Sequence, residues 1–332
     1  MATEGFAEFD GSQTWYRVYG ELPAGPDGPV APNSPAAPDG PVAPDSPVAT
    51  ASGSDTDGRA PLVVLHGGPG ATHDYLTPLA ELSDTGRAVV LYDQLGNGNS
   101  THYPERGADF WTVDLFVREL ANLIDHLGIG DRYHVLGQSW GGFLAQEHAL
   151  TQPPGLRSLV LSNTAASFPD FVSEANRLRR DLPPDVEATL RKHEADGTTD
   201  SADYINACMV FYQRHVCRLD PWPAGVTAGF AKIDEDPTVY HTMNGPSEFH
   251  VIGSIRDWSS TDRLGEIRVP TYVVSGEHDE ASPALQVPIV DGIRAAGNEV
   301  EQLVMAGCSH LPMWEKPDVY RAAVEQWLRR HD

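Results

Sequence analysis

Several features that mark other classes of protein are scarce or missing in this sequence of 332 residues. It has only three cysteines, Cys208, Cys217 and Cys308, and their odd number and wide spacing form neither a disulfide framework nor a metal-ligand pattern. No apolar run approaches the length that spans a bilayer, and the first residues lack the basic start and apolar stretch of a secretory signal. We therefore expect a cytoplasmic protein with no metal site and no membrane partner.

Basic residues are also scarce, with 23 lysines and arginines against 47 acidic residues and a formal net charge of −24. A surface of this sign repels the phosphate backbone of nucleic acids, so nucleic acid is excluded as a partner. A well-hydrated surface is the simplest interpretation of the acidic excess. Adaptation to high salt, where self-repulsion is screened, is the alternative.

Between residues 22 and 60 the chain lacks any regular apolar pattern and consists mostly of Pro, Ala, Gly, Ser and Asp. The segment PDGPVAPNSP that begins at Pro26 recurs almost unchanged from Pro38. Such a composition buries too little apolar surface to offset the entropy lost on ordering, which predicts a disordered surface insertion. A rigid proline-rich spacer, or a ligand for another domain, is the alternative. Residues 1–21, which alternate apolar and polar side chains around Asp10-Gly11, are predicted to form a hairpin before it.

After the insertion, short β-rich apolar runs alternate with helical patterns, which predicts an α/β fold with a mostly parallel sheet and helices on both faces. The predicted strands are residues 62–65, 88–92, 133–136, 158–161, 271–274 and 300–304. No comparable run occurs from residue 165 to residue 264, so we expect a helical cap there, inserted between two core segments, 61–164 and 265–332.

The sequence Gly137-Gln138-Ser139-Trp140-Gly141 follows a predicted strand and precedes a predicted helix. Glycines on both sides of a serine allow the strained strand-to-helix turn that lifts its hydroxyl above the sheet, the nucleophile elbow of α/β hydrolases. A serine that merely caps a helix is the alternative. In its context the motif predicts that Ser139 is a nucleophile.

In this fold the acid and the histidine that activate the serine follow it in that order along the chain. Only His310 and His331 lie beyond the region of the acid, and His331 is the penultimate residue, so we expect His310 to be the base. Asp279, which follows a strand through a glycine turn, is the predicted acid. Glu277 and Glu280 are competing carboxylates.

A tetrahedral intermediate also needs two preorganised hydrogen-bond donors for its oxyanion. The turn His66-Gly67-Gly68-Pro69-Gly70 directly follows a predicted strand and can direct its amides toward the elbow. The amides of Gly67 and Gly68 are therefore candidate donors, with Gly68 preferred, and the amide of Trp140 is the predicted second donor.

These motifs together resemble the proline iminopeptidase family of α/β hydrolases, which includes tricorn-interacting aminopeptidases and L-amino acid amidases. The resemblance covers most of residues 61–330. It rests on residues 66–70, 92–100 and 137–142, on the Asp279 and His310 loops and, for the aminopeptidase branch, on residues 244–249 and 253–258. The chain departs from the family at Leu95, Asn97 and Asn99, where Arg, Cys and Arg are common, so contacts near that loop are expected to differ.

The resemblance implies a cofactor-independent serine aminopeptidase that releases an N-terminal proline, or another small or apolar residue, from short peptides or amino-acid amides. Because a substrate ammonium entering a partly dry pocket needs carboxylate partners, two are expected. Glu248 resembles one carboxylate of the family, and Asp220 is the candidate for the second. Trp222, Phe249 and Trp258 are candidates for the pocket wall, or for the core of the cap.

Two other functions remain open at this stage. An L-amino acid amidase or an esterase would use the same scaffold and the same nucleophile. A non-catalytic ligand-binding protein is a further alternative, because the fold alone does not fix the function. The sequence does not indicate an oligomeric state.

Overall fold

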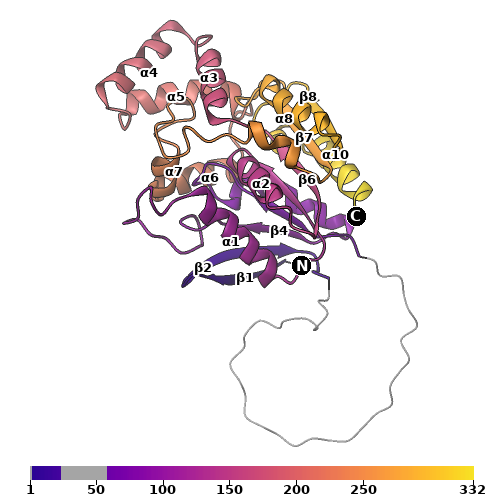
Figure 1. The fold of residues 1–332 in the computed structure, drawn as a ribbon. Coiled ribbons are helices and arrows are strands. Elements are labelled where there is room, and N and C mark those ends of the chain that lie inside the picture. Colours follow the sequence, from indigo (N-terminus) through magenta and orange to yellow (C-terminus); the bar gives the residue numbers. More distant parts are fainter. Residues whose placement is uncertain (1, 24–57) are drawn as a thin grey trace, which may run out of the picture.

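A computed structural model of the chain describes residues 2–23 and 58–332 (Figure 1). Most of the predicted disordered insertion, residues 24–57, lies outside the described residues. The described segments on either side of it, which end at residue 23 and begin at residue 58, both join the sheet domain.

One eight-stranded sheet forms the centre of the molecule, in the order β1-β2-β4-β3-β5-β6-β7-β8. Strands β1 and β2 pair antiparallel, as do β2 and β4, and all other neighbours are parallel. The bounds are β1 Ala2–Phe9, β2 Ser12–Tyr19, β3 Leu62–Leu65, β4 Val89–Tyr92, β5 Tyr133–Gln138, β6 Leu156–Ser162, β7 Thr271–Gly276 and β8 Val300–Met305. The predicted hairpin and the six predicted strands are thus confirmed, with differences only at their ends.

Both faces of the sheet are covered, because alternate side chains of the central strands enter two separate cores. Val63, Val90 and Val135 pack on one face together with side chains of α1, α2 and α8. Val64 and Leu91 pack on the other face with side chains of η1 and α10. The bounds are η1 His73–Thr85, α1 Val113–His126, α2 Trp140–Leu150, α8 Pro283–Ala295, α9 Pro312–Glu315 and α10 Pro317–Arg330. The α/β fold class predicted from the sequence is confirmed.

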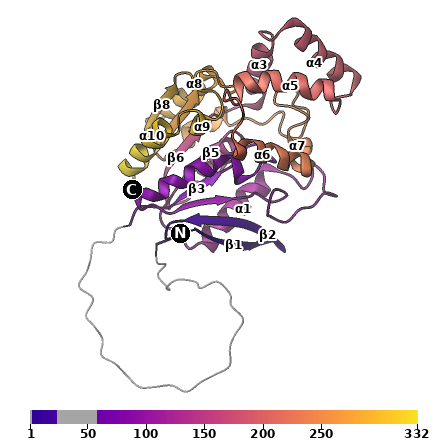
Figure 2. The same cartoon turned by 180° about the vertical axis from the view of Figure 1, so that it is seen from behind.

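The chain between β6 and β7 is helical. It contains α3 Phe168–Arg179, α4 Pro184–Asp196, α5 Ala202–His215, α6 Ala224–Glu235, α7 Thr238–Met243 and the 3-10 helix η2 Thr261–Glu266. Figures 1 and 2 show α3, α4 and α5 together at the end of the molecule opposite the β1–β2 hairpin, while α6 and α7 lie nearer the sheet. The limits of a separate cap at residues 165 and 264 remain an interpretation. In the described parts of the chain, no helix combines the length and the apolar character that a membrane span requires.

Candidate active site

Ser139 lies at the turn between β5 and α2. Its backbone has φ 55° and ψ −124°, a conformation that residues other than glycine rarely adopt. The glycines beside it are required by close packing. A Cβ atom on Gly137 would collide with the carbonyl of Gly141, and one on Gly141 would collide with the carbonyl of Leu65. The turn is tied to the next strand, since the amide of Ser139 donates to the carbonyl of Ser162 at 3.0 Å. The local sequence therefore builds the predicted elbow.

His310 and Asp279 form a buried pair in the loops after β8 and β7, with 2.6 Å between Nδ1 and Oδ1. Asp279 is fully buried and accepts two further hydrogen bonds, from Asn163 Nδ2 at 2.6 Å and from the amide of Ala281 at 2.9 Å. With its oxygens held in this way, Asp279 fixes the orientation of the imidazole and leaves Nε2 as the nitrogen available to a substrate or to Ser139.

The backbone of His310 is anchored as well. Its amide donates to the carbonyl of His215 at 3.2 Å, and its carbonyl accepts from Gln138 Nε2 at 3.1 Å. Because Gln138 precedes Ser139, the loop that carries the histidine is linked directly to the elbow.

The turn after β3 lies against Ser139, and its two candidate amides differ. The amide of Gly67 donates to the hydroxyl of Tyr75 at 2.5 Å, and this hydroxyl donates in turn to Gln138 Oε1 at 2.5 Å. The amide of Gly68 has no acceptor within the described residues. Trp140 is the first residue of α2, and the first N–H groups of a helix have no intrahelical partners. Gly68 and Trp140 thus present unpaired donors, whereas Gly67 does not.

Behind this turn, Gln94 joins the two candidate donor segments. Its backbone amide donates to His66 Nε2 and its side-chain Nε2 to the carbonyl of His66, both at 2.9 Å. Its Oε1 accepts from the indole of Trp140 at 2.9 Å. Gln94 is fully buried, so it fixes the turn relative to the elbow.

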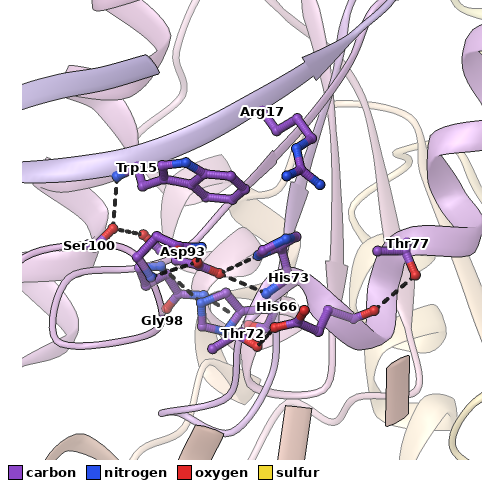
Figure 3. A network of polar contacts seen from close by, with 12 residues as sticks. Trp15, Arg17, His66, Thr72, His73, Thr77, Asp93, Gly98 and Ser100 are labelled. Atoms are coloured by element: carbon purple, nitrogen blue, oxygen red, sulfur yellow. Dashed lines mark hydrogen bonds and ion pairs between the residues drawn. The ribbon is translucent and has the colours of Figure 1, made fainter. Parts of the chain in front are cut away.

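A second buried network supports the segment from Asp93 to Ser100 (Figure 3). Asp93 accepts from the amide and from Nδ1 of His73, both at 2.8 Å. Its other oxygen accepts from the amide and the side chain of Asn99, both at 2.9 Å. Asn99 is one of the positions at which the family commonly has arginine, and here its short side chain folds back onto Asp93.

Ser139 and His310 face one cavity of about 420 Å³ between the sheet and the helical segment that follows β6. Gly67, Gly68, Ser139 and His310 contribute to its wall from the sheet domain. Apolar side chains from the cap make up much of the remaining wall and include Met209, Tyr212, Trp222, Val226, Phe230 and Ile233.

Three carboxylates line the same cavity, the exposed Asp234 and, nearer to His310, Glu248 and Glu280. Glu248 accepts a hydrogen bond from the hydroxyl of Tyr240 at 2.6 Å, and burial raises the pKa of Glu248. Glu280 is 2% exposed, with 3.6 Å between its Oε1 and His310 Nε2, and burial raises the pKa of Glu280 well above its usual range. The carboxylates are thus placed where an incoming cation would meet them.

Asp220, the second carboxylate expected from the sequence, does not line this cavity. Its side chain is exposed to solvent in the loop after α5, while Trp222, two residues on, turns inward. The structure therefore gives no support for Asp220 as a partner of the substrate ammonium. Phe249 is buried behind the wall, and Trp258 packs on Phe143 at 4.9 Å between ring centroids.

The model of the alpha/beta hydrolase fold family matches residues 60–317. The chain belongs to this family.

The proline iminopeptidase of Thermoplasma volcanium is 36% identical over 273 residues, which cover 82% of this chain and 90% of that protein. The proline iminopeptidase of Lactobacillus helveticus is 32% identical over 332 residues, which cover 99% of this chain and 98% of that protein. The crystal structure of the Mycobacterium smegmatis proline iminopeptidase is 43% identical, with a TM-score of 0.82 over 99% and 98% of the two chains. The crystal structure of VinJ is 45% identical, with a TM-score of 0.87 over 99% of both chains. The chain therefore belongs to the proline iminopeptidase family of serine hydrolases.

Three residues of the site were not assigned to it from the sequence. Glu280 had been considered only as a rival of Asp279, although its place directly after the acid was a signal that it shares the same loop. Gln94 lies in the segment 92–100 that carries the resemblance, but its contacts with His66 arise only because β3 and β4 are neighbours in the sheet. Tyr75 carries no signal of its own in the sequence.

Proposed function

We propose that this chain is a serine aminopeptidase that releases one small N-terminal residue from short peptides or amino-acid amides. The observation that carries the proposal is a single cavity bordered by Ser139, by His310, which is paired with Asp279, and by the carboxylates of Glu248 and Glu280. Ser139 attacks the first carbonyl carbon, and His310 Nε2 accepts its proton and then passes it to the leaving amine. Asp279 holds the imidazole in the tautomer that this transfer needs and stabilises the imidazolium.

In this proposal the negative charge of the tetrahedral intermediate is held by the amides of Gly68 and Trp140. Both lie beside Ser139 and have no competing acceptor near the reacting carbonyl. Preorganised donors of this kind stabilise developing charge without reorientation during the reaction. Gly67 then serves as cavity wall, since its amide is already bonded to Tyr75.

Selection of a free amino terminus is assigned to Glu248 and Glu280. An ammonium loses its hydration in a partly apolar cavity, and opposite charges at hydrogen-bond distance offset that loss. In the described part of the cavity wall these acids have no lysine or arginine partner, so the substrate supplies the missing cation.

A much smaller cavity beside Ser139 supports the proposal that the released N-terminal residue is small. It has a volume of about 10 Å³ and is walled by side chains that include Trp140, Phe143, Phe168 and Phe171. A space of this size holds about one water-sized group. It fits the methyl group of alanine or part of a proline ring, and a leucine or phenylalanine side chain would have to displace its walls.

The first test compares Ser139→Ala with the unaltered protein on L-prolyl and L-alanyl p-nitroanilides. Loss of the nucleophile is expected to lower kcat by at least about 10⁴-fold while the protein stays folded. Turnover by Ser139→Ala at the original rate would remove the serine mechanism. Failure of a fluorophosphonate probe to label Ser139 in the unaltered protein would favour a non-catalytic binding protein instead.

The second test addresses the amino terminus. Glu248→Gln is expected to lower kcat/KM on free-amine substrates by about 100-fold, because a buried charge pair is lost. It should change the slow rate on the N-acetylated twin only slightly. Asp220→Asn is the matched control and should behave as the unaltered protein on both. Equal effects of Glu248→Gln on blocked and free substrates would contradict the assignment of Glu248 to the amino terminus.

A panel of Pro, Ala, Leu and Phe amides and p-nitroanilides distinguishes an amidase from a peptidase.

A further inference from the structure

One imidazole in this cavity is surrounded by three carboxylates. Asp279 holds His310 Nδ1 at 2.6 Å, and Glu280 Oε1 lies 3.6 Å from His310 Nε2. Glu248 borders the same cavity and is bonded to Tyr240. From α5, His215 contributes its backbone carbonyl to the amide of His310, and burial lowers the pKa of the His215 imidazole, which keeps this ring neutral.

The charges of this cluster do not balance. Three ionised carboxylates and one imidazolium would leave two negative charges in the site. The described cavity wall contains no lysine or arginine, and its further titratable side chains include the exposed Asp234 and His241. Like charges brought together in a desolvated site retain protons that they would lose in water. Burial raises the pKa values of Glu248 and Glu280, but of the two groups that lie 3.6 Å apart His310 Nε2 carries the proton and Glu280 stays ionised. Burial by itself lowers the pKa of His310, but Asp279, Glu280 and Glu248 outweigh it and raise that pKa to about 9.

A retained proton on Nε2 conflicts with catalysis. Nδ1 is occupied by Asp279, so Nε2 is the only nitrogen of His310 that can accept the proton of Ser139. Glu280, at 3.6 Å, stabilises the protonated form of this nitrogen. At neutral pH the empty site is therefore held in a state that cannot activate the serine.

We propose that the ammonium of the substrate itself releases this proton, by replacing it as the cation beside Glu280 and Glu248. As R–NH₃⁺ enters, it pairs with the two glutamates, and the proton on His310 Nε2 leaves to solvent. The neutral Nε2 then accepts the hydrogen of the Ser139 hydroxyl. One cation enters and one proton leaves, so the charge of the cluster is unchanged.

This inference rests on the proposed aminopeptidase function and adds to it a reason for specificity. A free amino terminus would raise kcat as well as tighten binding, because it converts His310 to the basic form. A substrate without the amine would depend on bulk pH to remove the same proton. Selection for the amine then occurs in the chemical step and not in binding alone.

The most direct test counts the proton without requiring turnover. L-prolinol carries an ammonium that stays protonated between pH 6 and pH 8, and it has no scissile bond, so it can be used with the unaltered protein. Its competitive inhibition constant is expected to fall about tenfold per pH unit in this range, which corresponds to one proton released for each molecule bound. Calorimetry in two buffers of different ionisation enthalpy gives the same number independently. A pH-independent constant with no proton released overturns the inference, as does a failure of prolinol to bind.

Glu280→Gln removes the charge beside Nε2 with little change of shape. The pH dependence of prolinol binding is expected to flatten, and the rate on cyclopentanecarbonyl p-nitroanilide, the twin of the prolyl substrate without the amine, is expected to rise several-fold at pH 7. Glu266→Gln, on the exposed helix η2, is the matched control and should change neither. An unchanged prolinol slope in a folded Glu280→Gln protein would contradict the assigned role.

A kinetic measurement on the unaltered protein covers the case in which Glu280→Gln does not fold. The kcat of the prolyl substrate should already be near its plateau at pH 7, whereas that of the twin without the amine should keep rising to about pH 9. Coinciding profiles would overturn the inference even with Ser139→Ala inactive, whereas an active Ser139→Ala would instead overturn the proposed function.

Discussion

The molecule contains two buried histidine–aspartate pairs that look alike as pairs and differ in their surroundings. In one, His310 Nδ1 lies 2.6 Å from Asp279, and in the other, His73 Nδ1 lies 2.8 Å from Asp93. Both histidines are nearly buried, at 5% and 6% exposure, and both aspartates are fully buried. Neither the residue types nor the distances tell them apart.

The residues around each pair distinguish the two pairs. The ring of His310 borders the cavity next to Ser139 and Glu280, whereas the ring of His73 packs on Trp15 with 4.4 Å between centroids and does not border the cavity. Asp93 also accepts hydrogen bonds from Asn99, so it links the segment of His73 to the segment of Asn99. Hydrogen bonding to His73 offsets the effect of burial and lowers the pKa of Asp93. The comparison teaches that such a pair serves catalysis or structure according to what the remaining imidazole nitrogen faces.

The largest difference between the pairs should appear on replacing each aspartate by asparagine. Asp279→Asn presents an amide to His310 Nδ1 and stabilises the wrong tautomer, so kcat is expected to fall by about 10⁴-fold with KM much less affected. The urea midpoint should move far less than that of the corresponding Asp93 variant. A loss of kcat below tenfold would mean that the two pairs are not distinguished by function.

Asp93→Asn should show the opposite balance. One acceptor oxygen becomes a donor that faces other donors, and a buried charge is lost, so the free energy of unfolding is expected to fall by about 3 kcal/mol. Urea unfolding followed by tryptophan fluorescence measures this loss. The folded fraction should keep kcat within a few-fold, because Asp93 does not line the cavity that Ser139 and His310 border. A loss of kcat as large as that of Asp279→Asn, in folded protein, would contradict the structural role.

The sequence was sufficient for the first pair and silent on the second. Chain order and the elbow motif lead to Ser139, Asp279 and His310, and the alternation of apolar runs leads to the sheet, because these signals are local or follow from the fold. No local pattern links His73 to Asp93. Their contact depends on β3 and β4 being neighbours in the sheet, which brings the loops after both strands together.

The prediction of binding residues in the cap has the same limit, because contacts that depend on the tertiary fold leave no local pattern in the sequence. A motif led to Glu248, which lines the cavity, whereas the position of Asp220 depends on the path of an irregular loop and lies outside the cavity wall. Glu280 lines the cavity instead, because the loop after β7 buries Asp279 and Glu280 and leaves Glu277 exposed. Residues 24–57 lie outside the described part of the chain, so the insertion expected there stays a prediction.

The smallest expected effect concerns a third buried carboxyl group, behind the Asp93 segment. Glu119 Oε1 accepts from Thr14 Oγ1 at 2.6 Å and from the amide of Leu95 at 2.8 Å, while its Oε2 has no partner among the described residues. Burial, opposed by these two hydrogen bonds, raises the pKa of Glu119 to about 8. Leu95, whose amide donates to Glu119, is buried and supplies no charge to it. Glu119 is thus held as a neutral acid, in contrast to Asp93 beside it.

This assignment gives a pH dependence of defined sign. Between about pH 4.5 and pH 8 the folded protein keeps the proton of Glu119 and the unfolded chain loses it, so the free energy of unfolding falls as pH rises. Glu119→Gln removes this dependence. Relative to the unaltered protein, the variant should gain about 1 kcal/mol per pH unit from pH 5 to pH 8, and the difference should level off above that. Urea titrations at four pH values measure it, with Glu266→Gln as an exposed control. A pH-independent difference would show that Glu119 is ionised in the folded protein, and Asp93 and Glu119 would then no longer be distinguished as charged and neutral members of one network.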